Sequence, residues 1–161
     1  MGYTSYSLVQ FTWLIKMQYK KFDQQLHDQC DPPAREAVAT WLENLWYVDA
    51  QPNPDKYAVD LVLTKDGEHI GYAEVEVRDW GMNFCPYNTI HIAERKKKLF
   101  NHPRTTMYVV TKDYAHAYWI RANKIKECPL IEVPNTAVSR GEYFYDVPKD
   151  LWKFVDLREI F

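Results

Sequence analysis

Acidic side chains at alternating positions in residues 57–80 are the part of the sequence best suited to chemistry. They are Asp60, Glu74 and Glu76, each flanked by apolar residues that repeat at period two. Carboxylates held side by side repel one another, and a hard divalent cation, Mg²⁺ or Mn²⁺, is the usual means of compensating them. The sequence therefore predicts a metal site, provided that the three side chains share one face of a sheet.

The turn within residues 57–80 decides whether they do. Lys65-Asp66-Gly67 is a turn signal, so the segment predicts a β-hairpin. A two-residue turn would place Asp60 on the far side of the sheet from Glu74. A three-residue loop with Gly67 in the left-handed conformation sets Asp60 opposite Tyr72, one diagonal step from Glu74. Only this second register puts the apolar residues of both strands on one face, so we expect the three-residue loop.

The rest of the chain predicts helices and short strands around this hairpin. Helical spacing is expected in residues 4–28 and 34–46, with a break at Asp31-Pro32-Pro33, and residues 50–55 predict a loop. After the hairpin we expect a loop at 81–87, a strand at 88–92, a helix at 93–101, strands at 105–111 and 117–121, one helical turn at 124–128, strands at 130–133 and 142–147, and a closing helix at 152–161. The predicted fold class is α/β, a central mixed β-sheet flanked by helices, in a single domain over 1–161.

Composition and charge narrow the class of protein. The chain has 161 residues, of which 47% are hydrophobic, so it is long enough and apolar enough for a sizeable core. The formal net charge of −2 gives no general attraction to nucleic acid, so any such affinity must come from a local patch. Three separated cysteines favour reduced thiols, and no apolar run approaches the ~20 residues that span a membrane. We expect a soluble cytoplasmic protein, of a size that would suit a phage or mobile element.

The order of these elements resembles the PD-(D/E)XK nuclease superfamily, which has a restriction-endonuclease-like core. The resemblance covers about residues 34–112: a helix, a strand with Asp60, a strand with Glu74-Val75-Glu76, a basic helix and an apolar strand. It implies that Asp60 and Glu74 bind the metal, and that Glu76 stands where the family usually has Lys. Val59 stands where the family has Pro. Some restriction endonucleases of this family use Glu at the Lys position, and a Lys can also come from the following helix.

Further roles follow from this resemblance and from the chemistry of phosphodiester hydrolysis. The backbone carbonyl of Val75 is expected as an additional metal ligand beside Glu76. Arg95, Lys96, Lys97 and Lys98 are expected to contact phosphates, and one of the three lysines would replace the missing one. Glu36 or Glu43 would serve as the acid that many members carry in the first core helix. The predicted catalytic set is Asp60, Glu74, Glu76 and Lys97.

Three hypotheses remain open on the sequence alone. The first is a metal-dependent nuclease acting on DNA or RNA, as a monomer or a homodimer. The second is a catalytically inactive protein of the same fold that binds nucleic acid or inhibits another protein. The third is a protein-interaction domain unrelated to nucleases, which would equally explain the exposed aromatic residues. For the single features, the structural alternatives are that the acids line a solvated sheet face, that the basic run is a solvated helix face, and that Arg78 neutralises Glu76.

Overall fold

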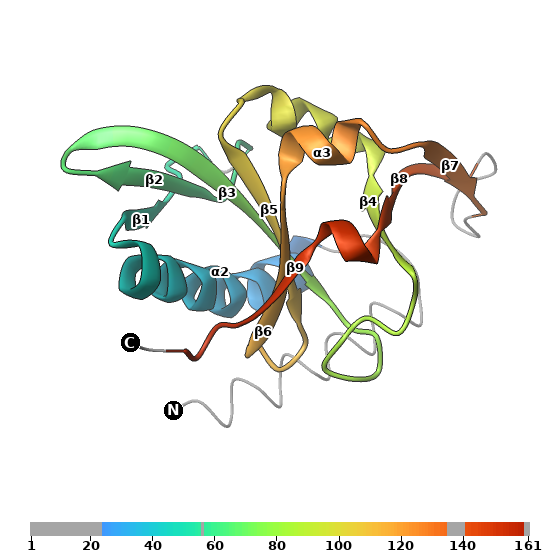
Figure 1. Cartoon of the computed structure of the whole chain (residues 1–161), viewed down its shortest axis with the longest axis horizontal. Coiled ribbons are helices and arrows are strands. Elements are labelled where there is room, and N and C mark those ends of the chain that lie inside the picture. The colour runs from blue at the N-terminus through green and yellow to red at the C-terminus, as the bar shows by residue number, and fades with distance from the viewer. Residues whose placement is uncertain (1–23, 56, 135–140, 160–161) are drawn as a thin grey trace.

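The computed structural model describes residues 24–55, 57–134 and 141–159. Its elements, in chain order, are α2 (Gln24–Trp46), β1 (Asp49–Pro52), β2 (Leu61–Lys65), β3 (Glu68–Arg78), β4 (Thr89–Ala93), the 3₁₀ helix η1 (Glu94–Asn101), β5 (Thr105–Thr111), β6 (His116–Arg121), α3 (Ala122–Lys126), β7 (Leu130–Val133), β8 (Glu142–Pro148), the 3₁₀ helix η2 (Lys149–Leu151) and β9 (Lys153–Asp156). Figure 1 shows them around one large twisted sheet. The predicted α/β class with a mixed sheet is confirmed.

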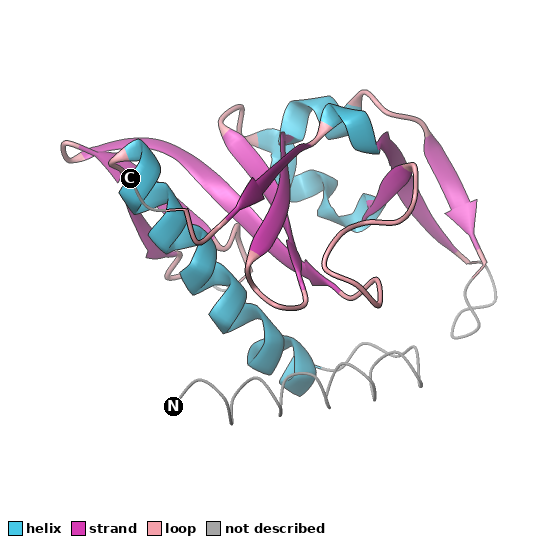
Figure 2. Cartoon of the chain, turned by 60° about the horizontal axis from the view of Figure 1, so that its bottom comes forward, coloured by secondary structure: helices cyan, strands magenta, loops and turns pink. Residues whose placement is uncertain are grey.

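Two sheets organise the described part of the chain. The larger has the strand order β1-β2-β3-β5-β6-β9, in which β3 and β5 run parallel and every other pair is antiparallel. The smaller is antiparallel, with the order β4-β8-β7. Figure 2 shows the long α2 crossing the larger sheet, while the smaller sheet stands at the opposite end of the molecule. Among the described residues, no helix is both long and apolar enough to cross a membrane.

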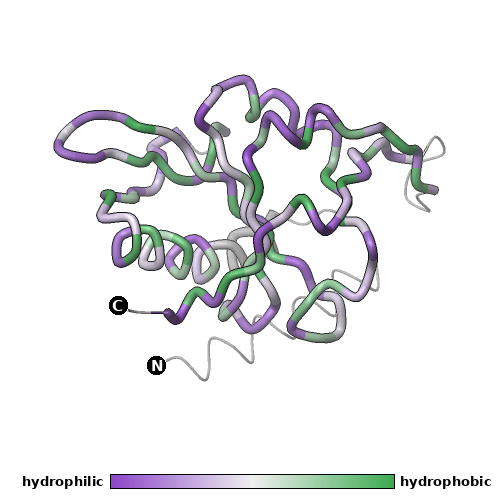
Figure 3. The backbone as a smooth tube through the Cα atoms, viewed as in Figure 1, coloured by the Kyte–Doolittle hydropathy of each residue, from purple (hydrophilic) through white to green (hydrophobic). Residues whose placement is uncertain are grey.

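Each face of the larger sheet is covered by its own core. On one face, Val38 and Trp41 of α2 pack with Leu61 and Val75. On the other, buried residues of β4, η1 and α3 pack with alternate residues of β5 and β6, among them Met107. The central strand β5 is therefore buried on both faces, as its nearly continuous apolar sequence predicts. Figure 3 shows the contrast along the hairpin, whose tip is hydrophilic and whose strands turn hydrophobic inside the sheet.

The hairpin reaches the expected parity by a different route, and the predicted pairing of Asp60 with Tyr72 is wrong, since Tyr72 pairs with Val62. Lys65 pairs with Glu68 across a two-residue turn at Asp66-Gly67, where both residues have positive φ (53° and 79°), so the predicted three-residue loop is wrong. A β-bulge then inserts Ile70 into β3, since Thr64 pairs with His69 and Leu63 with Gly71. The extra residue restores the parity that an odd loop would have given. From this point the two strands run with their apolar residues on one face, as the sequence predicts.

Helix α2 runs without interruption through Pro32 and Pro33, so the predicted break there is wrong. Proline fixes φ near the helical value and removes a backbone donor, which weakens a helix without necessarily ending it. Just beyond the prolines, Ala34 is fully buried. Of the predicted first helix, residues 24–28 are indeed helical, and residues 4–23 lie outside the described residues. The predicted end of the second helix at Trp46 is confirmed.

Two edge strands were not predicted. Residues 50–55, expected as a loop, include most of β1, which pairs with β2. The tail, expected as a helix from Trp152, contains β9, which pairs with β6. Both strands have four residues and lie at sheet edges, where the partner's open hydrogen-bonding groups decide the conformation more than local propensity does.

The remaining predictions after the hairpin are confirmed in type. The predicted strands correspond to β4, β5, β6, β7 and β8, within two residues at each end. The helical turn at 124–128 is α3, displaced by two residues. The predicted helix at 93–101 is η1, which is a 3₁₀ helix rather than an α-helix.

Candidate functional site

Asp60 and Glu74 lie together at the open end of the β2–β3 hairpin, away from its turn. Pairing ends at Leu61 and Ala73, one step before Asp60. The Val75 backbone N–H then donates to Asp60 Oδ2 (2.8 Å), and the Asp60 N–H donates to Glu74 Oε1 (3.3 Å). These two crossed hydrogen bonds continue the ladder through side chains instead of carbonyls. Both carboxylates are thereby fixed in position by backbone donors.

Lys96 completes this cluster from η1. Its Nζ lies 3.1 Å from Glu74 Oε2, and the two side chains are only 13% and 7% exposed. η1 follows β4 and precedes β5, which runs parallel to β3 at its side. The crossover between the parallel strands therefore carries the lysine over the acidic face. The cluster Asp60–Glu74–Lys96 combines three sequence-distant residues, each from a different element or its edge.

Glu76 lies two residues further along the same face but faces a different partner. Its Oε1 is 3.2 Å from Arg78 Nη2, while its Oε2 is buried without a hydrogen-bond partner among the described residues. Arg78 Nη2 also donates to the backbone carbonyl of His91 on β4 (2.8 Å). The expectation that Arg78 neutralises Glu76 agrees with this contact.

Electrostatics separate the two glutamates. Burial raises the pKa of Glu74 from its ordinary 4.5 to about 8, with Lys96 opposing the rise and Asp60 adding to it. Burial also disfavours charge on Glu76, but Arg78 and Lys96 outweigh it and lower the pKa of Glu76 to about 2. For Lys96, burial acts against the charged form, yet Glu76 and Glu74 raise its pKa. Burial and the neighbouring Asp60 thus make Glu74 the more readily protonated of the two glutamates, while Lys96 stays charged beside it.

The predicted set of metal ligands is only partly assembled. Within the described ranges, no group of three or more His, Cys, Asp or Glu side chains is arranged to hold a metal ion. Glu76 is turned toward Arg78, and Val75 buries its side chain in the core on the opposite face while its N–H serves Asp60. Asp60 and Glu74 remain as adjacent oxygen donors. Two carboxylates suffice for Mg²⁺, which keeps several waters and takes further oxygens from substrate phosphates.

Lys97, predicted as catalytic, does not reach the acids. Its Nζ lies 3.1 Å from Glu94 Oε1, and its side chain is 60% exposed. Residues three apart are eclipsed in a 3₁₀ helix, which brings Lys97 onto Glu94 and leaves Lys96 to turn inward. Arg95 and Lys98 are exposed on η1, where the predicted phosphate contacts would place them.

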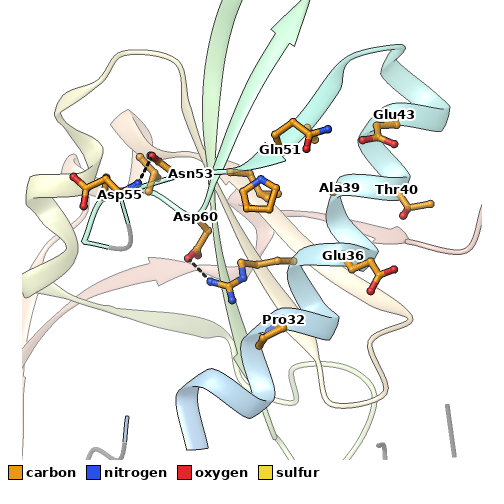
Figure 4. Close-up of a pocket in the computed structure, with 15 residues that line it drawn as sticks. Pro32, Glu36, Ala39, Thr40, Glu43, Gln51, Asn53, Asp55 and Asp60 are labelled. Atoms are coloured by element: carbon orange, nitrogen blue, oxygen red, sulfur yellow. Dashed lines mark hydrogen bonds and ion pairs between the residues drawn. The ribbon is translucent and has the colours of Figure 1, made fainter. Parts of the chain in front are cut away.

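On its α2 side, Asp60 lies near an arginine that the sequence analysis did not predict, in a pocket that also contains the two predicted helix acids. Asp60 Oδ1 lies 3.4 Å from Arg35 Nη1 on α2, and this ion pair closes one end of a pocket of about 660 Å³. Glu36 and Glu43 line the same pocket, but Figure 4 shows the Glu36 carboxylate turned away from Asp60 and Glu43 well removed from Asp60 along α2. The structure therefore does not bring either predicted helix acid to the Asp60–Glu74 pair. Nothing in the sequence pattern singles out Arg35, whose partner lies 25 residues away.

No protein-family model, no curated protein and no solved structure matches this chain. Function is therefore inferred from the side chains of the site and their geometry.

Proposed function

We propose that the chain is a metal-dependent nuclease that hydrolyses phosphodiester bonds in DNA or RNA, with a core of the restriction-endonuclease-like kind. One observation carries the proposal: Lys96 from η1 lies 3.1 Å from Glu74, which is itself bonded to Asp60. The resemblance expects two acids and a lysine at one point of a sheet, and the lysine absent from position 76 is supplied here by the following helix.

The order of the elements supports the same proposal. The described chain passes from α2 through β1 and β2 to β3, crosses over by η1 and returns as β5 parallel to β3. The acids lie on the strands that precede the crossover, and the lysine lies on the crossover itself. Because three groups from separate elements meet at one place, the cluster is more specific than the short sequence motif alone.

Each group has a definite role in this proposal. Asp60 and Glu74 would hold Mg²⁺ or Mn²⁺, which supplies a polarised phosphoryl oxygen and a bound water of lowered pKa. Lys96 places a fixed cation where negative charge increases on the phosphate. The exposed Arg95 and Lys98 attract the flanking phosphates.

A second candidate function is favoured by the ion pairs of the site. Asp60, Glu74 and Glu76 each lie near a basic side chain, namely Arg35, Lys96 and Arg78. The charge of the acids is therefore compensated by the chain itself, as would suit an inactive binding module of the same fold. A nuclease must instead let the metal take over part of this compensation.

Cleavage assays separate the two candidates. Labelled single- and double-stranded DNA and RNA are incubated with the protein in Mg²⁺, in Mn²⁺ and in EDTA. We expect metal-dependent cleavage that falls about 100-fold or more in Asp60→Asn, Glu74→Gln and Lys96→Met, because each removes a metal ligand or a fixed charge.

Lys97→Met is the matched control, since it removes the same charge from the next residue of η1 and should cleave within about 2-fold of the parent. Thermal melts identify any variant that has lost its fold. Equal cleavage by Lys96→Met and the parent would contradict the assignment of Lys96. Nucleic-acid binding without cleavage in either metal would favour the inactive module.

A further inference from the structure

A second pocket lies at the end of β3, beyond the acids. It has a volume of about 750 Å³ and is lined by the end of β3, the loop after it, β4 and the residue that follows β5. This volume lies within the range of small-molecule sites. The roles given to Asp60, Glu74 and Lys96 make no use of this pocket.

The pocket is in line with the acidic cluster. Arg78, which lines it, is on the same face of β3 as Glu74 and Glu76 and pairs with Glu76 at 3.2 Å. Four residues of a strand separate Glu74 from Arg78, a distance of ~13 Å. A nucleic-acid strand bound at Asp60 and Glu74 would therefore be able to reach this pocket a few nucleotides from the cleaved bond.

The walls of the pocket combine aromatic rings with cations. Trp80 is half-buried, and its ring meets Tyr118 edge to face at 5.7 Å, which holds it in one orientation. Tyr87 lines the pocket with 62% of its surface exposed. Lys112 adds a second cation, 3.7 Å from Asp79 Oδ1. Rings and cations together are the features that bind a base and its phosphate.

Arg78 retains donors for such a phosphate. Among the described residues, its contacts to Glu76 and to the carbonyl of His91 both engage Nη2. A guanidinium has five N–H donors, so Nη1 and Nε remain for an anion. The two contacts also hold the group in place, which reduces the entropy lost on binding.

The pocket at the other end of the site has the opposite character. Among the residues that the structure describes, its charged lining consists of four acids and one base: Glu36, Glu43, Asp55, Asp60 and Arg35. This lining repels a phosphate chain, whereas the two cations of the pocket beyond Arg78, Arg78 and Lys112, balance the acids Glu76 and Asp79 beside them. The charge difference directs a bound strand from the acids toward Arg78.

We propose that the pocket beyond Arg78 binds one unpaired nucleotide of the substrate, its base against Trp80 and Tyr87 and its phosphate against Arg78 and Lys112. The inference rests on the proposed nuclease function and specifies the substrate class as single-stranded nucleic acid. In a duplex the faces of a base are covered by neighbouring base pairs, so aromatic rings reach them only where the strand is unpaired.

Binding of labelled oligonucleotides to the full chain in EDTA, measured by fluorescence anisotropy, tests this site apart from cleavage. We expect a single strand to bind more tightly than a duplex of the same sequence. Tyr87→Ala should weaken single-strand binding by about 5- to 100-fold, the usual contribution of one stacked base. Tyr87→Phe, which keeps the ring, should restore it, and Lys112→Ala should weaken binding and reduce its salt dependence.

Tyr143→Ala is the matched control, because Tyr143 is a similarly exposed tyrosine on β8 outside this pocket. Equal affinity of Tyr87→Ala and the parent for the single strand would overturn the proposal, as would a parent that prefers the duplex. If Tyr87-dependent single-strand binding is found but nothing is cleaved, the nucleotide site stands and the nuclease function fails. If cleavage depends on Asp60 but Tyr87→Ala does not weaken single-strand binding, the nuclease function stands and the proposed nucleotide site fails.

Discussion

The two faces of the β2–β3 hairpin carry side chains of opposite character, one apolar and one charged. One face buries Leu61, Ala73 and Val75 against α2, with no polar side chain among its core members. The other face carries Asp60, Glu74 and Glu76, at most partly exposed and each set near a basic group. Adjacent residues on one strand thus contribute to stability and to the candidate site in turn.

This difference teaches where the free energy of folding comes from. Apolar burial on the α2 face stabilises the fold by about 25 cal/mol for each Å² removed from water. Burying carboxylates on the opposite face costs free energy that ion pairs only partly return. We therefore interpret the acidic face as retained for chemistry, at the expense of stability that the α2 face supplies.

The largest expected effect compares two neighbouring residues on opposite faces. Leu61→Ala removes a side chain that is 1% exposed and should lower the free energy of unfolding by about 2–5 kcal/mol. Asp60→Asn keeps an oxygen to accept the Val75 N–H and weakens only a partly exposed ion pair, so its loss should be about 1 kcal/mol or less. Urea denaturation measures both. Equal losses would show that the acidic face stabilises the fold as much as the apolar one.

The second effect is a dependence of the free energy of unfolding on pH, to which the acidic face of the hairpin contributes and the apolar face does not. Between pH 4.5 and about 8, Glu74 keeps its proton in the folded protein and loses it in the unfolded chain, because its pKa is raised on folding. The folded state then binds more protons, so the free energy of unfolding falls as pH rises through this window. Glu76 has the opposite sign: its lowered pKa stabilises the fold above pH 4.5, and this is lost as pH falls toward 2.

Glu74→Gln isolates the first of these contributions. In EDTA, the free energy of unfolding of the parent should fall by about 2–4 kcal/mol between pH 5 and pH 8, because this range covers most of the interval over which folding raises the pKa of Glu74. Glu74→Gln should lack this slope and be more stable than the parent at pH 8. Urea denaturation at five pH values provides the measurement. Parallel curves for the two proteins would mean that Glu74 ionises normally in the folded state.

How far the site could be predicted depends on which residues fix it. The shared face of Asp60 and Glu74 followed from the apolar alternation, because only one parity buries Leu61 with Val75. How the hairpin reaches this parity could not be predicted, because an odd-numbered loop and a two-residue turn followed by a bulge at Ile70 place the same residues on each face. Side-chain period is thus readable from the sequence, but the position of an inserted residue is not.

The contacts that Lys96 and Arg35 make with the acids could not be predicted from the sequence, for a different reason. Whether Lys96 or Lys97 faces the acids depends on the phase of η1, which would differ between an α-helix and the 3₁₀ helix found. Arg35 meets Asp60 across 25 residues of sequence, through the packing of α2 on the sheet. Tertiary packing, not local pattern, decides both contacts.

The smallest expected effect concerns Arg35, a base of the pocket beside Asp60. Its side chain is 31% exposed and its contact with Asp60 is long, at 3.4 Å, so Arg35→Met should lower the free energy of unfolding by about 0.5–1 kcal/mol. Because the aliphatic stem of methionine preserves packing, the loss reports mainly on charge. Urea denaturation in 0.05 M and 1 M salt should show a difference at low salt that shrinks at high salt, since screening weakens such pairs. A loss above 2 kcal/mol at both salt concentrations would mean that Asp60 is a buried charge dependent on Arg35, which would leave it unsuited to exchange that partner for a metal ion.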